Sequence, residues 1–287
     1  MKQKIVKYYF HDIDKHWVGN GFHVHGLLRE SKELNSLVSP FVMLDYASPK
    51  NFEKSSEIRG VGEHPHRGFE TVTFAYKGEI EHKDSSGGGG VISQGDVQWM
   101  TAGSGIVHNE YHSKNFTSKG GVFEMVQLWV NLPQKFKMTK PKYQSIKKDS
   151  IPSFNLTSKS RIRVIAGSYG KALGPANTYT KINIFEIYSK LQDKININIE
   201  RNTNTILLIL NGSIIINEVN YNKESLLVFD NENSELIINT SNDFKGLILN
   251  GTPINEPIVS YGPFVMNSKD EINQAIIDYN NGKMGNL

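Results

Sequence analysis

The sequence predicts an all-β protein made of two tandem, jelly-roll-like β-barrels and one C-terminal helix. Short runs of β-branched and aromatic residues recur along the chain, and glycine-rich turns separate them. Many short strands with such turns are typical of antiparallel sandwiches and barrels. A Lys-, Pro- and Ser-rich stretch divides the runs into two groups, and the 287 residues are enough for two domains. We therefore expect an N-terminal barrel at 1–135, a linker at 136–160 and a C-terminal barrel at 161–287.

The N-terminal half carries strand signals at short intervals. Residues Phe69–Tyr76 read F-E-T-V-T-F-A-Y, and Lys77 with Gly78 supplies a turn directly after them. The run Asp84–Gly90 contains four consecutive glycines and predicts a loop. Further strands are expected at Val97–Thr101, Ile106–Tyr111 and Phe123–Leu132.

The C-terminal half repeats the strand pattern and ends in a helix. Residues Lys194–Glu200 alternate strictly between isoleucine and polar residues, which is typical of a half-buried strand. Ser268 and Glu271 have the spacing of a capping box and predict a helix at about 268–281, with Gly282 after its end. Its apolar residues have helical spacing and should dock it on one of the barrels. They are Ile272, Ala275, Ile276 and Tyr279.

Composition excludes several classes of protein. The 32 basic and 29 acidic residues give a formal net charge of +3, too mild to indicate binding of nucleic acid or an anionic membrane. Cysteine is absent, so there is no disulfide framework, thiolate metal site or cysteine nucleophile. The first residues lack the apolar core of a signal peptide, and no run approaches the roughly 20 apolar residues of a membrane span. We expect a soluble cytoplasmic protein without a membrane or direct nucleic-acid partner.

All nine histidines lie in the first 112 residues, and three of them join a glutamate in two pairs with strand spacing. The pairs are His64 with His66 and His108 with Glu110. Residues two apart in a strand point to the same face, so each pair can direct both side chains at one point. If the two strands face each other, the four groups converge on one ion. Three imidazoles and a carboxylate suit Fe, Mn, Ni, Cu or Zn, and they leave about two positions open on an octahedral ion.

Three further ionisable residues are candidates for supporting this site. Glu70 lies four residues after His66 and could ligate the metal or fix a ligand. His82 lies beside the glycine-rich loop and could line the mouth of the cavity. His112 shares the face of Glu110 in a regular strand, so it could replace or support a ligand.

The remaining features near the site have weaker signals. Phe69 and Trp99 are candidates for an apolar wall, although core packing explains both equally well. His23 and His25 also have strand spacing, but they have no second pair, so we expect them at the surface or behind a ligand. The loop at Ser85–Gly90 lacks the lysine and the following helix of a nucleotide loop, and we interpret it as a flexible hairpin loop flanking a pocket.

Two long motifs resemble the pirin family of the cupin superfamily. The first is G-E-H-P-H-R-G-F-E-T-V-T at Gly62–Thr73, and the second is G-D-V-Q-W-M-T-A-G-S-G-I-V-H-N-E at Gly95–Glu110. R-V-I-A-G at Arg163–Gly167 and F-V-M-N at Phe264–Asn267 are also similar to pirin signatures. The resemblance extends over nearly the whole chain.

The resemblance implies a bicupin with one metal, usually Fe(II), in the N-terminal barrel. The family's ligands match His64, His66, His108 and Glu110, and its C-terminal barrel typically has no metal. Some bacterial members resemble quercetin 2,3-dioxygenases, which implies a small aromatic flavonol or enol substrate, O₂ as co-substrate, release of carbon monoxide, and Glu110 as general base. The alternative is a non-enzymatic iron- or redox-responsive regulator that binds a protein partner.

Overall fold

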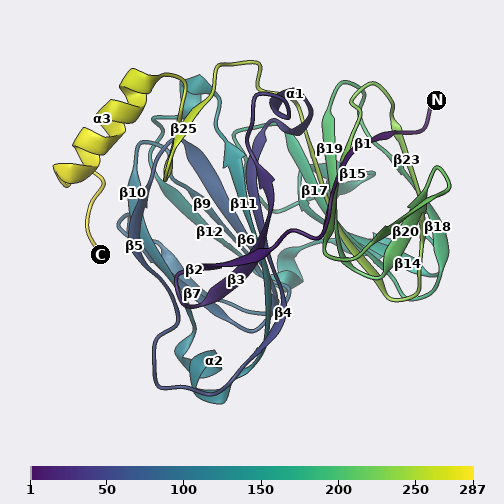
Figure 1. The fold of residues 1–287 in the computed structure, drawn as a ribbon, viewed down its shortest axis with the longest axis horizontal. Helices are drawn as coiled ribbons and strands as arrows, with labels where there is room; N and C mark the ends of the chain where they lie inside the picture. The colour runs from purple at the N-terminus through teal and green to yellow at the C-terminus, as the bar shows by residue number, and fades with distance from the viewer. Residues whose placement is uncertain (1) are drawn as a thin grey trace. The chain divides into compact units, whose positions relative to one another are not determined.

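The computed structural model describes residues 2–287 and divides them into two compact units. The N-terminal barrel comprises residues 14–26, 41–148 and 254–287, and the C-terminal barrel comprises residues 2–13, 27–40 and 149–253. Each end of the chain therefore belongs to the unit formed mainly by the opposite half. Each unit contains one seven-stranded and one four-stranded sheet (Figure 1). The prediction of an all-β protein with two barrels and a C-terminal helix is confirmed.

The N-terminal barrel is built on two sheets. The seven-stranded sheet has the order β12 (Lys142–Ile146), β9 (Val97–Thr101), β6 (Phe69–Lys77), β11 (Gly121–Asn131), β4 (Phe41–Phe52), β3 (Phe22–Arg29) and β2 (Lys15–Val18). The four-stranded sheet has the order β5 (Gly60–His66), β10 (Ile106–His112), β7 (Ile80–Asp84) and β8 (Gly89–Ile92). The remaining elements are β25 (Val259–Tyr261), β26 (Phe264–Met266), α2 (Lys114–Lys119), α3 (Lys269–Asn280) and the 3-10 turn η1 (Gln134–Phe136).

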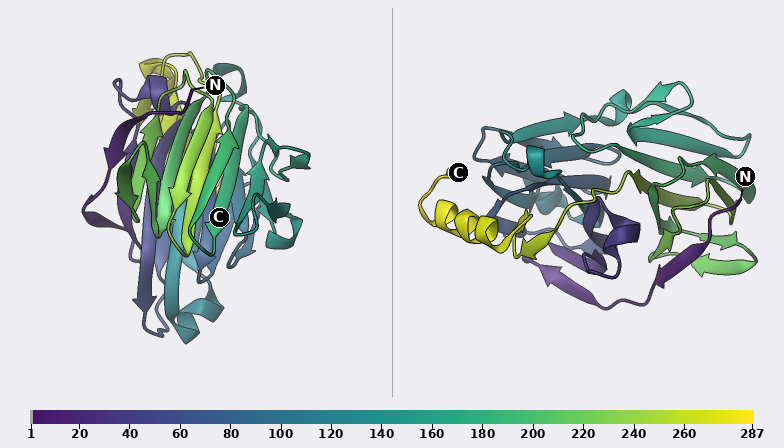
Figure 2. Two further views of the ribbon diagram at one scale, coloured as in Figure 1. Left: turned by 90° about the vertical axis from the view of Figure 1, so that its right-hand side faces the viewer. Right: turned by 90° about the horizontal axis from the view of Figure 1, so that it is seen from above.

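The C-terminal barrel has the same division into sheets. Its seven-stranded sheet has the order β1 (Val6–Phe10), β22 (Ser225–Phe229), β19 (Asn204–Asn211), β24 (Phe244–Gly251), β17 (Ile182–Ser189), β14 (Ser160–Ala166) and β13 (Ser153–Asn155). Its four-stranded sheet has the order β18 (Asp193–Asn198), β23 (Glu235–Thr240), β20 (Ser213–Ile216) and β21 (Val219–Asn222). Strand β24, yellow-green in Figure 2, lies between its green neighbours β17 and β19. The remaining elements are β15 (Ser168–Tyr169), β16 (Ala172–Leu173), α1 (Asn35–Val38) and the 3-10 turn η2 (Lys148–Ser150), which begins at the division between the units.

Burial explains why some strands alternate apolar with polar residues and others are mostly aromatic or β-branched. Strand β18 alternates as predicted, with Ile195 and Ile197 buried and Lys194 and Asn196 exposed, so only one face of its sheet is covered. Strand β6 is different, because every residue of it except the last is buried. It lies inside its sheet between β9 and β11, and its continuous β-branched and aromatic run fits a strand covered on both faces.

The C-terminal helix forms where the capping box predicts it. The Ser268 hydroxyl accepts a hydrogen bond from the Glu271 backbone N–H, and the Glu271 carboxylate accepts one from the Ser268 backbone N–H. Ile272 and Ala275 are buried as expected, but Tyr279 is exposed. Asp278 is buried in its place, because its carboxylate pairs with the Arg67 guanidinium 2.9 Å away. Within residues 2–287, no helix is long and apolar enough to cross a membrane.

The glycine-rich loop is shorter than the sequence predicts. Gly89 and Gly90 belong to β8, which pairs with Lys83 and His82 of β7. A backbone ladder needs no side chains, and the positive φ of both residues, 152° and 143°, is accessible to glycine. The prediction that the loop continues to Gly90 is therefore wrong, and the turn is confined to residues 85–88.

Candidate metal centre

Strands β5 and β10 bring three histidines together. The strands pair antiparallel, with His108 opposite His64 and Ile106 opposite His66. The ring centroids of His64 and His66 lie 4.2 and 4.9 Å from that of His108. One ligand-capable nitrogen of each ring lies within 4.8 Å of the other two. Period-two spacing on neighbouring strands is enough to produce this cluster.

The hydrogen bonds of His64 and His66 leave a lone pair on both imidazoles for a metal ion. His64 Nδ1 lies 2.8 Å from the Gly62 carbonyl oxygen, and His66 Nδ1 lies 3.3 Å from that of Pro263. Because a carbonyl oxygen only accepts, both rings carry their proton on Nδ1 and keep the Nε2 lone pair. His108 Nε2 is buried and has no hydrogen-bond partner among residues 2–287. A buried polar atom without a partner costs free energy, so this donor set fits a metal ion.

Burial also selects the protonation state that ligates metals. Desolvation lowers the pKa of His66 and of His108 well below the ordinary value for histidine. The neighbouring imidazoles act in the same direction, because clustered positive charges repel one another. Neutral imidazole is the form that binds a metal ion.

Glu110 lies next to the three histidines but is held by other groups. The register of β10 against β5 shifts between His108 and Glu110, because β5 has one extra residue between Val61 and His64, whereas β10 pairs regularly with β7 at these positions. Glu110 Oε1 accepts a short hydrogen bond from the Gln98 side-chain amide and a second one, at 3.3 Å, from the Thr73 hydroxyl. Its carboxylate forms a second group of potential ligands with His108 and His82, in which the ligand atoms again lie within 4.8 Å of one another.

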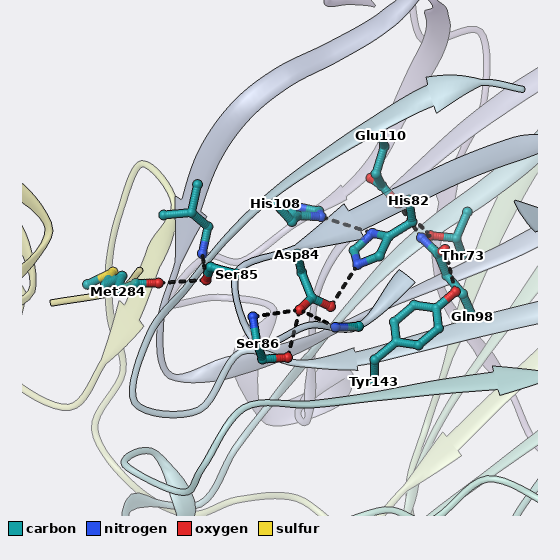
Figure 3. A network of polar contacts seen from close by, with 12 residues as sticks. Thr73, His82, Asp84, Ser85, Ser86, Gln98, His108, Glu110, Tyr143 and Met284 are labelled. Carbon is teal, nitrogen blue, oxygen red and sulfur yellow. Dashed lines mark hydrogen bonds and ion pairs between the residues drawn. The ribbon is translucent and has the colours of Figure 1, made fainter. Parts of the chain in front are cut away.

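His82 connects the cluster to a buried carboxylate on the same strand (Figure 3). Its Nδ1 lies 3.3 Å from His108 Nδ1, and its Nε2 lies 3.1 Å from Asp84 Oδ2. The other carboxylate oxygen, Asp84 Oδ1, accepts from Ser86 N, Ser86 Oγ and Gly88 N at 2.8, 2.6 and 3.0 Å. The turn at residues 85–88 is thus held in place by hydrogen bonds from Ser86 and Gly88 to the Asp84 side chain.

A cavity of about 260 Å³ adjoins the cluster inside the N-terminal barrel. His64, His66 and Glu110 contribute polar groups to its lining, and Gln127 adds a side-chain amide. Most of the remaining wall is apolar, so the cavity can enclose an apolar or aromatic molecule beside the imidazoles. These apolar residues include Val18, Phe22, Val24, Met43, Met125 and Trp129.

Two of the candidate supporting residues lie outside both ligand groups. Glu70 is fully buried, its Oε1 accepts a 2.7 Å hydrogen bond from the Thr101 hydroxyl, and burial raises its pKa to about 7. His112 Nε2 donates to the Gly21 carbonyl oxygen over 2.9 Å, and burial lowers the pKa of the ring to about 4. The ring packs among phenylalanines, which makes His112 a core residue of the barrel.

The aromatic candidates have different surroundings from each other. Phe69 is buried behind the site and packs against His66 and Trp129, with centroid distances of 5.1 and 4.2 Å. Trp99 is fully buried and is not part of the cavity lining. His23 stacks on Trp17 with a centroid distance of 4.6 Å, and His25 belongs to neither ligand group within residues 2–287.

Sequence reasoning missed two groups that orient ligand rings. Asp84 follows His82 with the same period-two spacing that identified the other pairs, so this spacing was an available signal. Pro263 acts through its backbone carbonyl, 197 positions from His66, and nothing in the local sequence indicates the contact. The orientation of the site therefore depends on β7 and on the C-terminal segment as well as on the two ligand strands.

Comparisons with known proteins match both halves of the chain. The family profile described as Pirin matches residues 21–130, and the one described as Pirin C-terminal cupin domain matches residues 184–285. A crystal structure of quercetin 2,3-dioxygenase from Acinetobacter baumannii has 46% sequence identity and a TM-score of 0.95, with 99% of each chain covered. This match confirms that both barrels are of the cupin type.

Two sequence relatives extend over similar lengths. A Pseudomonas aeruginosa protein with the name "Putative quercetin 2,3-dioxygenase" is 44% identical over 95% of this chain and 95% of its own. Pirin-like protein 2 from Arabidopsis thaliana is 34% identical over 99% of this chain and 86% of its own.

Proposed function

The chain belongs to the pirin family, and from that premise we propose that it is a metal-dependent dioxygenase that opens the central ring of quercetin or a similar flavonol or enol. The observation that carries the proposal is the cluster of three imidazoles beside a cavity with apolar walls. The name of the Acinetobacter baumannii relative supports the substrate class. One flavonol and one O₂ would give one ring-opened ester and one carbon monoxide, so the atoms balance.

The proposed cofactor is one Fe(II) ion held by His64, His66, His108 and Glu110. When bound, the metal would supply a Lewis acid that accepts a substrate hydroxyl oxygen and lowers the pKa of that hydroxyl group. The three imidazoles supply neutral nitrogen donors. Glu110 already lies in the cavity wall, and because Gln98 and Thr73 hold its Oε1, Oε2 is the atom that it would offer to the metal.

The cavity wall binds and orients the aromatic substrate. Trp129 lies 5.2 Å from the His66 ring and 4.2 Å from Phe69, measured between ring centroids, so its indole has a defined position. The wall around Phe22, Val24 and Met125 is apolar and excludes water from the ring that is to be cleaved. A planar polyphenol fits such a wall through ring contacts, while its hydroxyl groups face the imidazoles and Gln127.

Glu110 is the proposed acceptor of the substrate hydroxyl proton. Both of its hydrogen bonds go to Oε1, so Oε2 would take the proton when it is not bound to the metal. Gln98 fixes the carboxylate, and its own amide oxygen accepts a 3.4 Å hydrogen bond from the Tyr143 hydroxyl. The one hydroxyl proton of Thr73 is shared between Gln127 Oε1, 2.7 Å away, and Glu110 Oε1, 3.3 Å away, which joins the base to the polar part of the cavity wall.

The test is quercetin turnover in air by the purified protein, with metal analysis of the same sample. We expect the flavonol absorbance to fall only with metal-loaded protein, with one O₂ consumed and one carbon monoxide released for each quercetin. His64→Ala should lose metal and turnover together, and Glu110→Gln should lose turnover faster than it loses metal. Turnover by metal-free protein, or loss of flavonol without carbon monoxide, would contradict the proposal.

A further inference from the structure

His108 differs from the other two histidines of the cluster in what orients its ring. Backbone carbonyl oxygens, which can only accept, lie beside Nδ1 of His64 and of His66. The partner of His108 Nδ1 is the ring nitrogen His82 Nδ1, 3.3 Å away, which can donate or accept according to its tautomer. The contact between the two rings therefore leaves open whether His108 keeps its lone pair on Nε2 or on Nδ1.

Asp84 decides the direction of this hydrogen bond. The side chains of His82 and Asp84 are both fully buried, and His82 Nε2 lies 3.1 Å from Asp84 Oδ2. Burial works to raise the pKa of Asp84, but hydrogen bonds from His82, Ser86 and Gly88 lower it to about 2. The carboxylate has no proton to donate, so His82 donates from Nε2. With its proton on Nε2, the imidazole of His82 has only a lone pair on Nδ1, and His108 must donate to it from its own Nδ1.

We propose that Asp84 and His82 form a positioning relay that fixes His108 as the Nδ1–H tautomer and so presents its Nε2 to the metal. The unpaired, buried Nε2 of His108 is the end point of this chain of donors and acceptors. The inference rests on the proposed metal-binding function for its purpose, but the tautomer itself is a property of the metal-free protein. A merely structural Asp–His pair would stabilise the fold without determining the tautomer of His108.

Asp84→Asn reverses the relay while keeping the shape of the side chain. Three donors from the turn surround Oδ1, so the amide oxygen of the variant stays there and the amide nitrogen replaces Oδ2. That nitrogen donates to His82 Nε2, which moves the proton of His82 to Nδ1. His108 Nδ1 then has to accept, and its own proton moves to Nε2, where it blocks the metal.

The experiment measures ring tautomers in the metal-free protein and then Co(II) affinity. Long-range ¹H–¹⁵N spectra at pH 7.5 should show His108 as Nδ1–H in the wild type and as Nε2–H in Asp84→Asn. Titration with Co(II) should show an affinity lower by about 10- to 100-fold in that variant. Asp96→Asn is the matched control, because Asp96 is equally buried and caps a turn through Ser93 and Lys148 without contacting an imidazole.

The outcomes separate this inference from the proposed function. Wild-type His108 in the Nε2–H form overturns the relay, and so does an Asp84→Asn protein with unchanged tautomers and unchanged Co(II) affinity. If Asp84→Asn does not fold, the wild-type spectrum still decides which tautomer His108 adopts. His82→Phe provides a second variant, in which an aromatic ring can still stack on Tyr143 but has no nitrogen to pair with His108. If His108 is Nδ1–H but the protein neither binds metal nor consumes quercetin, the relay stands and the proposed function fails. Metal bound through His82 in place of His64 and His66 would also overturn the relay.

Discussion

Removing one buried side chain from α3 should weaken the support of two ligand strands at once. Ile272 packs in an apolar cluster with Val107, the residue before His108. The same helix carries Asp278, which pairs with Arg67, the residue after His66. Ile272→Ala therefore perturbs a helix that contacts positions adjacent to two of the clustered histidines, while leaving every potential ligand in place.

The size of the effect follows from burial. Ile272 is 6% exposed, and the substitution removes three side-chain carbons. At about 0.8 kcal/mol for each buried carbon, transfer alone contributes about 2.4 kcal/mol. A partly collapsed cavity increases the expected loss of unfolding free energy to about 3 kcal/mol. Ile277→Ala is the matched control, because Ile277 is on the same helix but is 51% exposed, and it should cost less than about 0.5 kcal/mol.

Urea denaturation and amide hydrogen exchange measure this difference. We expect Ile272→Ala to lower the unfolding midpoint and to accelerate exchange of the α3 amides by about 100-fold if the helix opens as a local unit. Ile277→Ala should leave both quantities close to the wild type. Equal losses in the two variants, or a loss below about 1 kcal/mol for Ile272→Ala, would refute the role of this packing.

Three further predictions concern the barrel and its site. Glu70→Gln should gain stability relative to the wild type as pH rises from 4.5 to 7, because burial raises the pKa of Glu70 to about 7 and the folded wild type is penalised for ionising it. A pKa difference of about 2.5 corresponds to at most about 3.4 kcal/mol in urea melts above pH 7, and a pH-independent difference between the two proteins would contradict the prediction. Trp129→Leu should raise KM for quercetin about tenfold and leave Co(II) affinity within about twofold, since Trp129 lines the cavity without offering a ligand atom. A loss of Co(II) affinity as large as the rise in KM would contradict a role of Trp129 in substrate binding alone. Gly88→Ala should weaken Co(II) binding about tenfold, because a Cβ there would lie 2.3 Å from Asp84 Oδ2; unchanged affinity would mean that Asp84 does not orient the site.

Local periodicity explains how much of the site could be predicted from the sequence. The spacing of His64 with His66 places both on one face of a strand, and pairing of β5 with β10 then brings His108 to them. The capping box of α3 was equally accessible, because both of its partners lie within one helical turn.

Features that depend on register or on distant contacts could not be predicted in the same way. The extra residue of β5 between Val61 and His64 shifts the register of that strand against Glu110, and nothing in the sequence indicates this bulge. Asp278 replaces Tyr279 on the buried side of α3 because Arg67, far away in the sequence, supplies its partner. Gly89 and Gly90 resemble a loop by composition but complete the edge of a backbone ladder.

Anomalous diffraction from crystals loaded with Fe(II) would locate the metal ion among the side chains of the N-terminal barrel. We expect one strong peak at the iron edge, bonded to Nε2 of His64, His66 and His108, with the Glu110 carboxylate beside it. Full iron loading with the peak elsewhere, or a peak bonded to His82 without His64 and His66, would contradict the assignment of the metal centre.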